Sequence, residues 1–401
     1  MQDAFIYDGI RTPFGRFGGQ LASVRPDDLL SLAIRTLVQR NPFALGQFED
    51  VVAGCTNQAG EDSRNVARHA GLLAGLPVTV AGQTVNRLCG SGLAAVIDTS
   101  RAIRCEEGAL YIAGGVESMS RAPYVLAKAE SPYARNQTMY DTVIGARFAN
   151  PLIQEAFGNH SMPETADNIA ADLSLPRDQA DAFAERSQTL YQKALAQGFY
   201  TEELLEVEVS QGRKHPTLKV SADEHPRPES SAEKLAKLPP LFKDGVVTAG
   251  NASGINDGAA ALILGSYQAG ADAGIKPRGR IVSCAVAGVE PRVMGLGPVP
   301  ASRKALALAG LTLDDMDVIE INEAFAVQVM GCAQQLGIGF NDVRLNANGG
   351  AIAIGHPLGA SGARLALTAL RQLEVQQTRY ALVTMCIGVG QGIAVIIERC
   401  R

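Results

Sequence analysis

The stretch Val85–Ala95, VNRLCGSGLAA, decides the fold, because it predicts a strand that turns sharply into a helix. The largely apolar run Pro77–Val85 leads into it, and a helical pattern follows it. Cys89 is therefore expected at a helix N-terminus, where free N–H groups and the helix dipole favour a thiolate. Gly90 and Gly92 leave room beside the sulfur for a substrate. The alternative is a buried structural cysteine, the usual role of a free thiol.

Composition limits the class of protein. The chain has 401 residues, 46% of them hydrophobic, so we expect two domains or a doubled fold. A net charge of −5 argues against a nucleic-acid-binding protein, and no apolar run is long enough to predict a membrane span. Seven cysteines without paired spacing, and no signal peptide, favour reduced thiols in a cytoplasmic protein. Five scattered histidines and no C-x-x-C motif argue against a metal site.

Strands and helices alternate in the first part of the chain. The pattern predicts strands at Asp3–Gly9, Asp50–Ala53 and Ala109–Ala113, with helices at Pro26–Val38 and Asn65–Gly75 between them. Such alternation predicts an α/β fold with a largely parallel sheet.

The second half of the chain repeats the first. FEDVVAGCTNQ (Phe48–Gln58) resembles MDVIEINEAFA (Met316–Ala326), and LYIAGGVES (Leu110–Ser118) resembles LVTMCIGVG (Leu382–Gly390) at nearly the same separation. The repeat predicts a duplicated α/β unit with a pseudo-twofold axis. Loops at corresponding strand ends would then meet in one crevice.

A long excursion, Glu117–Val247, separates the two halves. It is polar and rich in proline, and we expect loops, a few helices such as Arg177–Gln197, and a hairpin. Several apolar residues argue against a disordered linker and are expected to anchor it: Phe148, Phe157, Phe183 and Leu190.

Further stretches are expected to join Cys89 at the crevice. They are NEAF (Asn322–Phe325), NANGGAIAIGHPLGASG (Asn346–Gly362) and CIGVGQG (Cys386–Gly392). His356 stands on a rigid, glycine-rich loop before a helix that begins at about Ser361, which suits a general base, although a structural histidine is the alternative. The glycines from 388 to 392 only superficially resemble a dinucleotide loop, because no helix follows them. Their free N–H groups suit an oxyanion instead.

Five motifs stand in the order and spacing of the thiolase family: RLCGSG, GNASGINDGA, NEAFA, NGGAIAIGHPLGASG and CIGVGQG. The resemblance extends from Ile10–Gly19 to the last strand. It implies the thiolase fold, an α/β fold of two similar five-stranded mixed-sheet halves with an inserted loop domain. The implied boundaries are 1–117 with 248–272 for the N-terminal half, 118–247 for the loop domain and 273–401 for the C-terminal half.

The resemblance also implies partners. CoA and a 3-oxoacyl-CoA would be substrates, with no permanently bound cofactor and no nucleic-acid or membrane partner. A homotetramer built as a pair of dimers is implied as well, with loops of the excursion joining the dimers.

A role for each site residue is implied in the same way. Cys89 would take the acyl group, His356 would activate it, and Cys386 would act as acid and base at the α-carbon of acetyl-CoA. Asn322 would position a water that forms one oxyanion hole with His356, and the N–H groups of Cys89 and Gly388 would form the other. Contacts with CoA or the pocket wall are implied for Ser253, Ala249, Met162 and Phe325.

Within the family, the finer resemblance is to thiolases that cleave 3-oxoadipyl-CoA to succinyl-CoA and acetyl-CoA. CTNQAGEDSRNVAR, GVESMSRAPY, SMPETADNIA, DEHPRPE and GVEPRVMGLGPVPA carry it. Ser161 precedes Met162 where biosynthetic thiolases tend to have histidine, which favours a degradative enzyme. A buried carboxylate at the far end of such a substrate needs a cation, preferably an arginine. Candidates are Arg64, Arg121 and Arg147.

Three alternatives remain open at this point. One is a 3-ketoacyl-CoA or acetoacetyl-CoA thiolase of another chain length. A ketoacyl synthase would share the fold but carry histidine or asparagine in place of Cys386. A non-catalytic lipid-binding relative could lose Cys89 or His356, whereas this chain has both.

Overall fold

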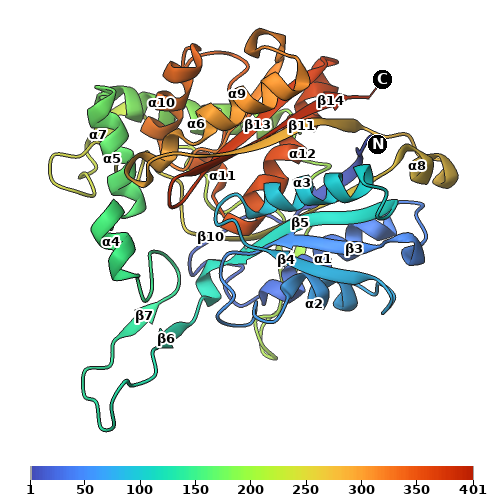
Figure 1. The fold of residues 1–401 in the computed structure, drawn as a ribbon, viewed down its shortest axis with the longest axis horizontal. Coiled ribbons are helices and arrows are strands. Elements are labelled where there is room, and N and C mark those ends of the chain that lie inside the picture. Colours follow the sequence, from blue (N-terminus) through green and yellow to red (C-terminus); the bar gives the residue numbers. More distant parts are fainter. Residues whose placement is uncertain (1, 401) are drawn as a thin grey trace.

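The first half of the molecule is a five-stranded mixed sheet (Figure 1). The computed structural model describes residues 2–400, so the outermost residues of the predicted domain boundaries, 1 and 401, lie outside it. β3 runs parallel to both β4 and β5, whereas β10 runs antiparallel to β5 and β1. In spatial order the strands are β4 (Ala81–Val85), β3 (Asp50–Gly54), β5 (Leu110–Ser118), β10 (Asn256–Gly265) and β1 (Phe5–Arg11).

The second half repeats this order and these directions. β12 is parallel to β13, and β14 is antiparallel to both β13 and β11. A short antiparallel contact between β1 and β11 joins the two halves into one sheet. The duplication predicted from the sequence is therefore confirmed. The strands are β12 (Val318–Ile321), β13 (Tyr380–Ile387), β14 (Gln391–Arg399) and β11 (Gly279–Gly288).

Within the described residues, the expected fifth strand of the second half is reduced to one bridge, in which Leu345 pairs with Ile319. The next residue, Asn346, has a positive φ of 46° and leaves the extended conformation. Its side-chain amide instead donates to the carbonyl of Ile321 and accepts from the N–H of Ile321, each at 2.9 Å. The side chain thus hydrogen-bonds the backbone groups at the edge of β12 with which a fifth strand would otherwise pair.

Helices form three layers around the two parts of the sheet (Figure 1). One outer layer covers the first half and the other outer layer covers the second half. The central layer lies between the halves and packs on both. The outer helices are α1 (Pro26–Gln39) and α2 (Val66–Leu73) on one side and α9 (Pro298–Ala309) and α10 (Ala326–Leu336) on the other, and the central helices are α3 (Ser91–Arg104) and α12 (Leu358–Gln376).

Glycines allow the two central helices to touch through their backbones. A Cβ on Gly92 would lie 2.5 Å from the carbonyl oxygen of Gly359, and a Cβ on Gly362 would overlap the backbone of α3. No other residue type fits there without movement, because interiors are close-packed. The contact fixes the start of α3, which follows Cys89, against the start of α12, which follows His356.

The excursion contains two hairpins where one was expected, and four helices. The hairpins are β6–β7 (Tyr124–Leu126, Met139–Asp141) and β8–β9 (Val207–Val209, Leu218–Val220), and the helices are α4 (Pro151–Phe157), α5 (Met162–Asp172), α6 (Arg177–Ala196) and α7 (Ala232–Ala236). The remaining short elements are β2 (Gly15–Arg16), α8 (Tyr267–Ala273), α11 (Ala351–Ile354), η1 (Leu45–Gln47), η2 (Met119–Arg121), η3 (Pro291–Leu296) and η4 (Leu313–Asp315).

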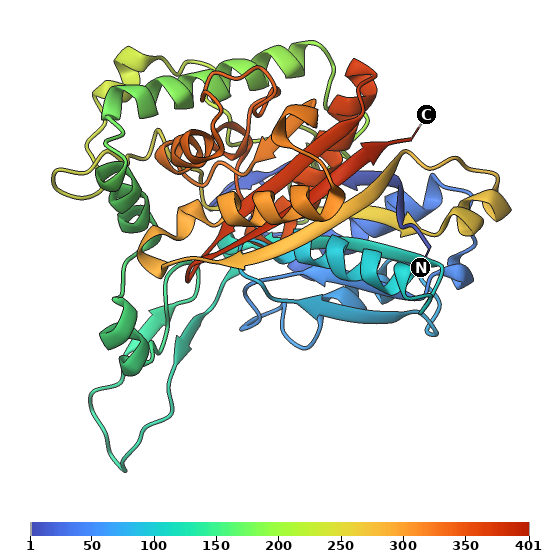
Figure 2. The ribbon, with the colours of Figure 1, turned by 45° about the horizontal axis from the view of Figure 1, so that its top comes forward.

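One part of the excursion is an arm, residues 122–158, that reaches away from the body (Figure 2). Phe148 and Phe157 lie on it and are 52% and 50% exposed, so the expectation that they anchor the excursion is wrong. The reason is that the arm leaves the body (Figure 2), so these side chains stay exposed. Phe183 on α6 is buried as expected, and Leu190 is partly buried.

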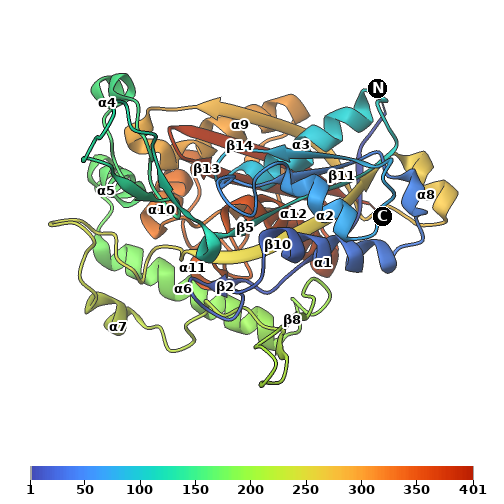
Figure 3. The same cartoon turned by 90° about the horizontal axis from the view of Figure 1, so that it is seen from below.

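The other part of the excursion is fastened to the sheet. α6 lies along α10 and α11 (Figure 3). Arg11, at the end of β1, is fully buried and donates to Glu203 and Asp223 at 2.6 Å each. Removing one partner of such a pair would leave a buried charge unpaired, so this contact holds the excursion in place.

Most predicted elements are present with shifted ends. Pro77–Val80 is an exception, since it forms a turn before β4 rather than part of the strand. No helix within residues 2–400 combines the length and apolar character that a membrane crossing needs.

Gly92→Ala should lower the free energy of unfolding by about 1–3 kcal/mol, because its Cβ would force α3 and α12 apart. Urea denaturation measures the change. Gly46→Ala in η1 is the control, since a Cβ there meets no atom within 4 Å. Equal losses in both variants would contradict the role of the backbone contact.

Candidate active site

Cys89 lies one residue before Gly90, the N-cap of α3, as the sequence predicts. The preceding residue, Leu88, has a positive φ of 46°, which makes the turn from β4 into α3 sharp. Two backbone N–H groups, those of Gly388 and of Cys89 itself, lie near the sulfur and favour its charged form. The sulfur therefore lies where the end of β13 meets the start of α3.

The expected thiolate at Cys89 is not supported. Burial raises the pKa of the Cys89 thiol to about 11, and the negative charge of Glu117 raises it further, while the two N–H groups lower it only in part. Moving a thiolate out of water costs more free energy than its interaction with the helix N-terminus regains. The resting cysteine is consequently a neutral thiol at pH 7.

His356 is held on every side. Its backbone N–H donates to Asn256 Oδ1 at 2.8 Å, and its Nδ1 lies 2.6 Å from Ser361 Oγ. The Ser361 hydroxyl donates to the carbonyl of Pro357 at 2.8 Å, so it accepts from Nδ1–H and leaves a lone pair on Nε2. Burial, and then the charge of Arg364, lower the pKa of His356 to about 3. The imidazole is therefore neutral at pH 7, with its acceptor lone pair on Nε2.

Asn322 joins His356 to the second half of the sheet. Its backbone N–H donates to the carbonyl of Thr384 at 3.0 Å, which continues the pairing of β12 with β13. Its side-chain Nδ2 lies 3.3 Å from His356 Nε2. The polar atoms of these two residues thus face the same point.

Cys386 lies on β13, two residues before Gly388. Burial raises the pKa of its thiol well above the ordinary range, and the charges of Cys89 and Cys332 raise it further. Residues 388–390 form the tight turn between antiparallel β13 and β14, with positive φ at Val389 and Gly390. This turn excludes a dinucleotide loop and leaves the Gly388 N–H free to face Cys89.

The other predicted contact residues reach the same region to different degrees. The N–H of Ser253 donates to the carbonyl of Ala324 at 2.9 Å, and Phe325 forms a bridge with Ala252. A Cβ on Gly388 would lie 3.7 Å from the sulfur of Met162. Ala249 is exposed, on the segment that leads to Ser253.

Sequence reasoning missed Glu117. Its carboxylate accepts three backbone N–H groups, from Thr56, Asn57 and Gly359, at 3.1, 3.0 and 2.9 Å. Gly359 lies in the first turn of α12, which begins at Leu358 rather than at about Ser361 because this carboxylate caps it from another strand. The sequence signal that could have revealed this role is a single carboxylate within an otherwise apolar strand.

Glu117 also belongs to a buried group with Cys55 and Asp62 whose possible ligand atoms lie within 4.8 Å of one another. The Glu117 oxygens are already occupied by the three N–H groups. The Cys55 thiol donates to the carbonyl of Asn57 at 3.0 Å. The group is therefore a helix cap rather than a metal centre.

The three candidate arginines differ in their partners. Arg121 binds both oxygens of Glu61, at 2.5 and 2.7 Å, so it is not free for a substrate. Within residues 2–400, Arg64 and Arg147 form no ion pair. Arg64 is exposed and Arg147 is half-buried at the base of the arm.

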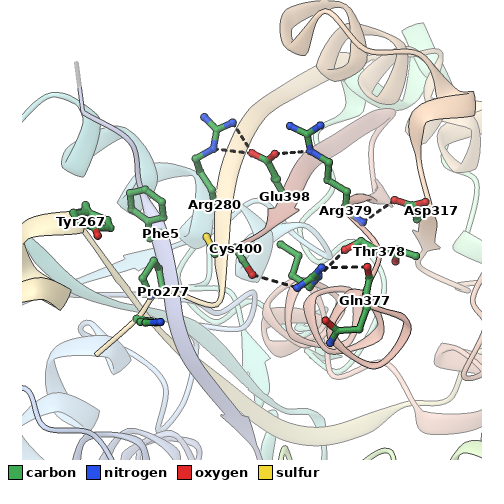
Figure 4. A pocket seen from close by; sticks show the side chains of 12 residues that line it. Phe5, Tyr267, Pro277, Arg280, Asp317, Gln377, Thr378, Arg379, Glu398 and Cys400 are labelled. Atoms are coloured by element: carbon green, nitrogen blue, oxygen red, sulfur yellow. Dashed lines mark hydrogen bonds and ion pairs between the residues drawn. The ribbon is translucent and has the colours of Figure 1, made fainter. Parts of the chain in front are cut away.

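A depression of about 900 Å³ lies at the opposite end of the strands (Figure 4). Two of its arginines, Arg280 and Arg379, point at the carboxylate of Glu398 and bind it at 2.6 and 2.8 Å. It opens beside the start of β13, whereas Cys386 lies near the end of that strand. We therefore assign the chemistry to the cysteine site.

Comparison with known proteins agrees with this site. Residues 4–268 match the family model "Thiolase, N-terminal domain", and residues 275–399 match "Thiolase, C-terminal domain". The chain is 57% identical, over 100% of both proteins, to the 3-oxoadipyl-CoA/3-oxo-5,6-dehydrosuberyl-CoA thiolase of Escherichia coli K12. It is 53% identical, again over 100% of both, to a beta-ketoadipyl-CoA thiolase of Acinetobacter baylyi. The Bacillus anthracis acetyl-CoA acetyltransferase structure superposes with a TM-score of 0.93 at 36% identity, covering 100% of this chain and 99% of that one.

The alkylation of Cys89 by iodoacetamide should rise about tenfold per pH unit above neutrality, because the thiolate fraction does so below a pKa of about 11. Mass spectrometry of the Cys89 peptide measures the rate, and Cys89→Ser identifies the signal. A rate that levels off near pH 7 would instead indicate a resting thiolate paired with imidazolium.

Proposed function

The chain belongs to the thiolase family, and on that premise we propose that it cleaves 3-oxoadipyl-CoA with CoA to give succinyl-CoA and acetyl-CoA. As a thiolase it is an acyltransferase. The substrate assignment rests on full-length sequence identity of 53–57% to thiolases that are named for this substrate. The Escherichia coli relative is named for a second acyl group as well, and both groups derive from dicarboxylic acids.

In the first half-reaction, Cys89 Sγ attacks the 3-oxo carbon while its proton passes to His356 Nε2. A neutral thiol beside a neutral imidazole supports this order, since the charge then forms only as the bond forms. The N–H groups of Cys89 and Gly388 stabilise one oxyanion, and Asn322 positions a water that stabilises the other with His356.

The C2–C3 bond then breaks, and the electron pair leaves on C2 as the enolate of acetyl-CoA. The Cys386 thiol protonates C2, which is supported by its place on β13 two residues before Gly388, since Gly388 lies against Leu88 beside Cys89. His356 then passes its proton to the Cys386 thiolate, so that both groups return to their resting forms. The thiol of CoA attacks the acyl carbonyl on Cys89 as its proton passes to His356, and His356 returns that proton to the Cys89 sulfur as the sulfur leaves. CoA is thus a substrate, and no permanently bound cofactor is needed.

We propose that CoA lies along Ser253 and Ala249, with Met162 and Phe325 against the acyl group. The pairing of the Ser253 segment with the Ala324 carbonyl supports this, as does Met162 beside Gly388. The loop domain is placed at 118–247, between the halves 1–117 with 248–272 and 273–401. Seven free thiols support a cytoplasmic location.

A homotetramer, built as a pair of dimers, is proposed from the arm. Exposed apolar side chains rarely gather on a monomer, and here they do so along one projecting segment. They are Tyr124, Leu126, Met139, Phe148, Leu152 and Ile153. The mass of the protein in solution is the measurement that decides this assembly.

Cys386→Ala should slow solvent exchange of the acetyl-CoA α-protons far more than it slows acylation of Cys89. The reason is that Cys386 is assigned to proton transfer at the α-carbon, whereas Cys89 is assigned to attack on the carbonyl carbon. Deuterium uptake by acetyl-CoA and the mass of the Cys89 peptide measure the two steps separately. Exchange at the wild-type rate would remove Cys386 from the acid–base role.

We propose Arg147 as the partner of the substrate's second carboxylate. The hydroxyl and carbonyl oxygens of Thr142, shortly before it, accept hydrogen bonds from Asn57 at the end of β3. Arg147 therefore starts from the rim where the parallel strands end. Among the described residues, its guanidinium forms a single weak hydrogen bond, 3.3 Å to the carbonyl of Gly145. Such a fork matches a carboxylate.

Arg147→Leu should erase a preference for 3-oxoadipyl-CoA over 3-oxohexanoyl-CoA and spare turnover of the latter. A charge-assisted hydrogen bond of about 1.5–3 kcal/mol gives a preference of roughly 10- to 150-fold in kcat/KM. Arg64→Leu, at an exposed arginine that also lacks an ion pair, is the matched control and should keep the preference.

Two outcomes would contradict these assignments separately. If Arg64→Leu erased the preference, the carboxylate partner would be Arg64. If the wild-type enzyme preferred the uncharged substrate, the 3-oxoadipyl assignment would fail in favour of a thiolase of another chain length.

A further inference from the structure

The turn between β13 and β14 contains a strained residue that the reaction above does not use. Ile387 pairs with Gln391, so residues 388–390 make the turn, and φ is 62° at Val389 and 80° at Gly390. Turns with two successive positive φ values favour asparagine, aspartate or glycine at the first position and glycine at the second. Valine is poorly suited to the first position, because its branched Cβ crowds the backbone. Val389 therefore raises the free energy of this turn.

Packing does not explain why a valine stands at this position. The side chain of Val389 is 61% exposed, whereas Gly388 and Gly390 on either side of it are buried. An exposed valine gains little free energy from hydrophobic burial, so burial does not offset the strain. Backbone strain of this kind is concentrated at functional sites, where the surrounding structure imposes it. The place of this turn beside Cys89 therefore points to a role in the reaction.

The chain is fixed on both sides of Val389. Ile387, at the end of β13, is completely buried. Gly390 is held by Val289, whose N–H donates to the Gly390 carbonyl at 2.8 Å. A Cβ on Gly390 would lie 2.2 Å from the carbonyl oxygen of Val289, so only glycine fits there without movement. These contacts impose the positive φ on Val389.

Gly388 links this turn to the reacting groups. Its N–H lies near the Cys89 sulfur and is assigned above to an oxyanion hole. A Cβ built on Gly388 would lie 3.2 Å from Leu88 Cδ1 and 3.7 Å from the sulfur of Met162, so the residue lies close to these two side chains. Glycine has no Cβ to restrict its φ and ψ. The direction of its N–H therefore depends on the residues that flank it.

We propose that Val389 is a positioning residue, which keeps the N–H of Gly388 directed at the oxyanion that forms during acyl transfer. The left-handed region open to a residue with a Cβ is small, so a valine held there changes its φ and ψ only slightly. A glycine in the same place moves through a much larger range. An oxyanion donor is effective when it is aligned in advance, so confinement at Val389 favours catalysis at a cost in stability. This inference rests on the proposed function only through the oxyanion role of Gly388.

Val389→Gly and Val389→Asn together test this role. Glycine and asparagine both tolerate a positive φ, so each variant should melt about 2 °C higher than the wild-type protein. Asparagine keeps a Cβ and the confinement that it brings, whereas glycine releases the turn. The kcat should therefore fall about tenfold in Val389→Gly and stay within about twofold of the wild-type value in Val389→Asn. The Kd for CoA should be nearly unchanged in both variants.

Exchange of isotopically labelled CoA into acetyl-CoA, through an acetyl group on Cys89, measures this kcat without any 3-oxoacyl-CoA. The two proposals can therefore fail separately. Exchange by a wild-type protein that did not cleave 3-oxoadipyl-CoA would remove only the substrate assignment. Equal exchange by the wild-type protein and Val389→Gly would overturn only the role of Val389.

Gln377→Gly is the matched control for the relief of strain. Gln377 also has a positive φ, of 56°, and it is exposed at the end of α12, beside the depression at the opposite end of the strands. This variant should melt higher than the wild-type protein and exchange CoA at the wild-type rate.

Three further outcomes would overturn the positioning role. An equal loss of exchange in Val389→Gly and Val389→Asn would show that the apolar side chain matters rather than its confinement. A weaker affinity for CoA as the only change in Val389→Gly would assign Val389 to CoA binding. Lower melting temperatures in both variants would show that Val389 is not strained.

Discussion

The backbone contact between α3 and α12 is the constraint on which the rest of the structure depends. Gly92, Gly359 and Gly362 remove the side chains that would separate the helices. Each helix starts directly after a reactive residue, Cys89 in one case and His356 in the other. Bringing the helix starts together therefore brings a nucleophile from one half of the duplicated fold to a base from the other. Glu117 completes the contact, because it binds both the end of β3 and the first turn of α12.

Burial sets the electrostatics of the site. A cysteine at a helix start usually gains acidity, but here desolvation outweighs the dipole and raises the pKa of Cys89 to about 11. The same burial keeps His356 neutral, with a pKa of about 3. The resting site therefore holds no charge on its reacting groups. Charge appears during the reaction, and in the proposed mechanism it appears beside prearranged N–H donors.

The excursion divides into two parts with different roles. α6 and its neighbours are fastened to the body through the Arg11 ion pairs and belong to the folded core. The arm carries apolar side chains that this chain does not cover, among them Phe148 and Phe157. A surface of that kind is stable only with a partner or a ligand against it. In our proposals, this arm is where subunits assemble and where Arg147 recognises the acyl group.

The sequence by itself determined the duplicated α/β unit, the corner at Cys89 and the order of the site motifs. Periodicity and glycine spacing are local properties, so they can be read without coordinates. The sequence also predicted five strands in the second half and a thiolate at Cys89, and both predictions were wrong. The tertiary structure decided these points, because Asn346 replaces a strand through a distant side-chain contact and because desolvation depends on what surrounds the sulfur. The role of Glu117 could not be predicted from local sequence for the same physical reason: its partner Gly359 is far away along the chain and near only in the folded state.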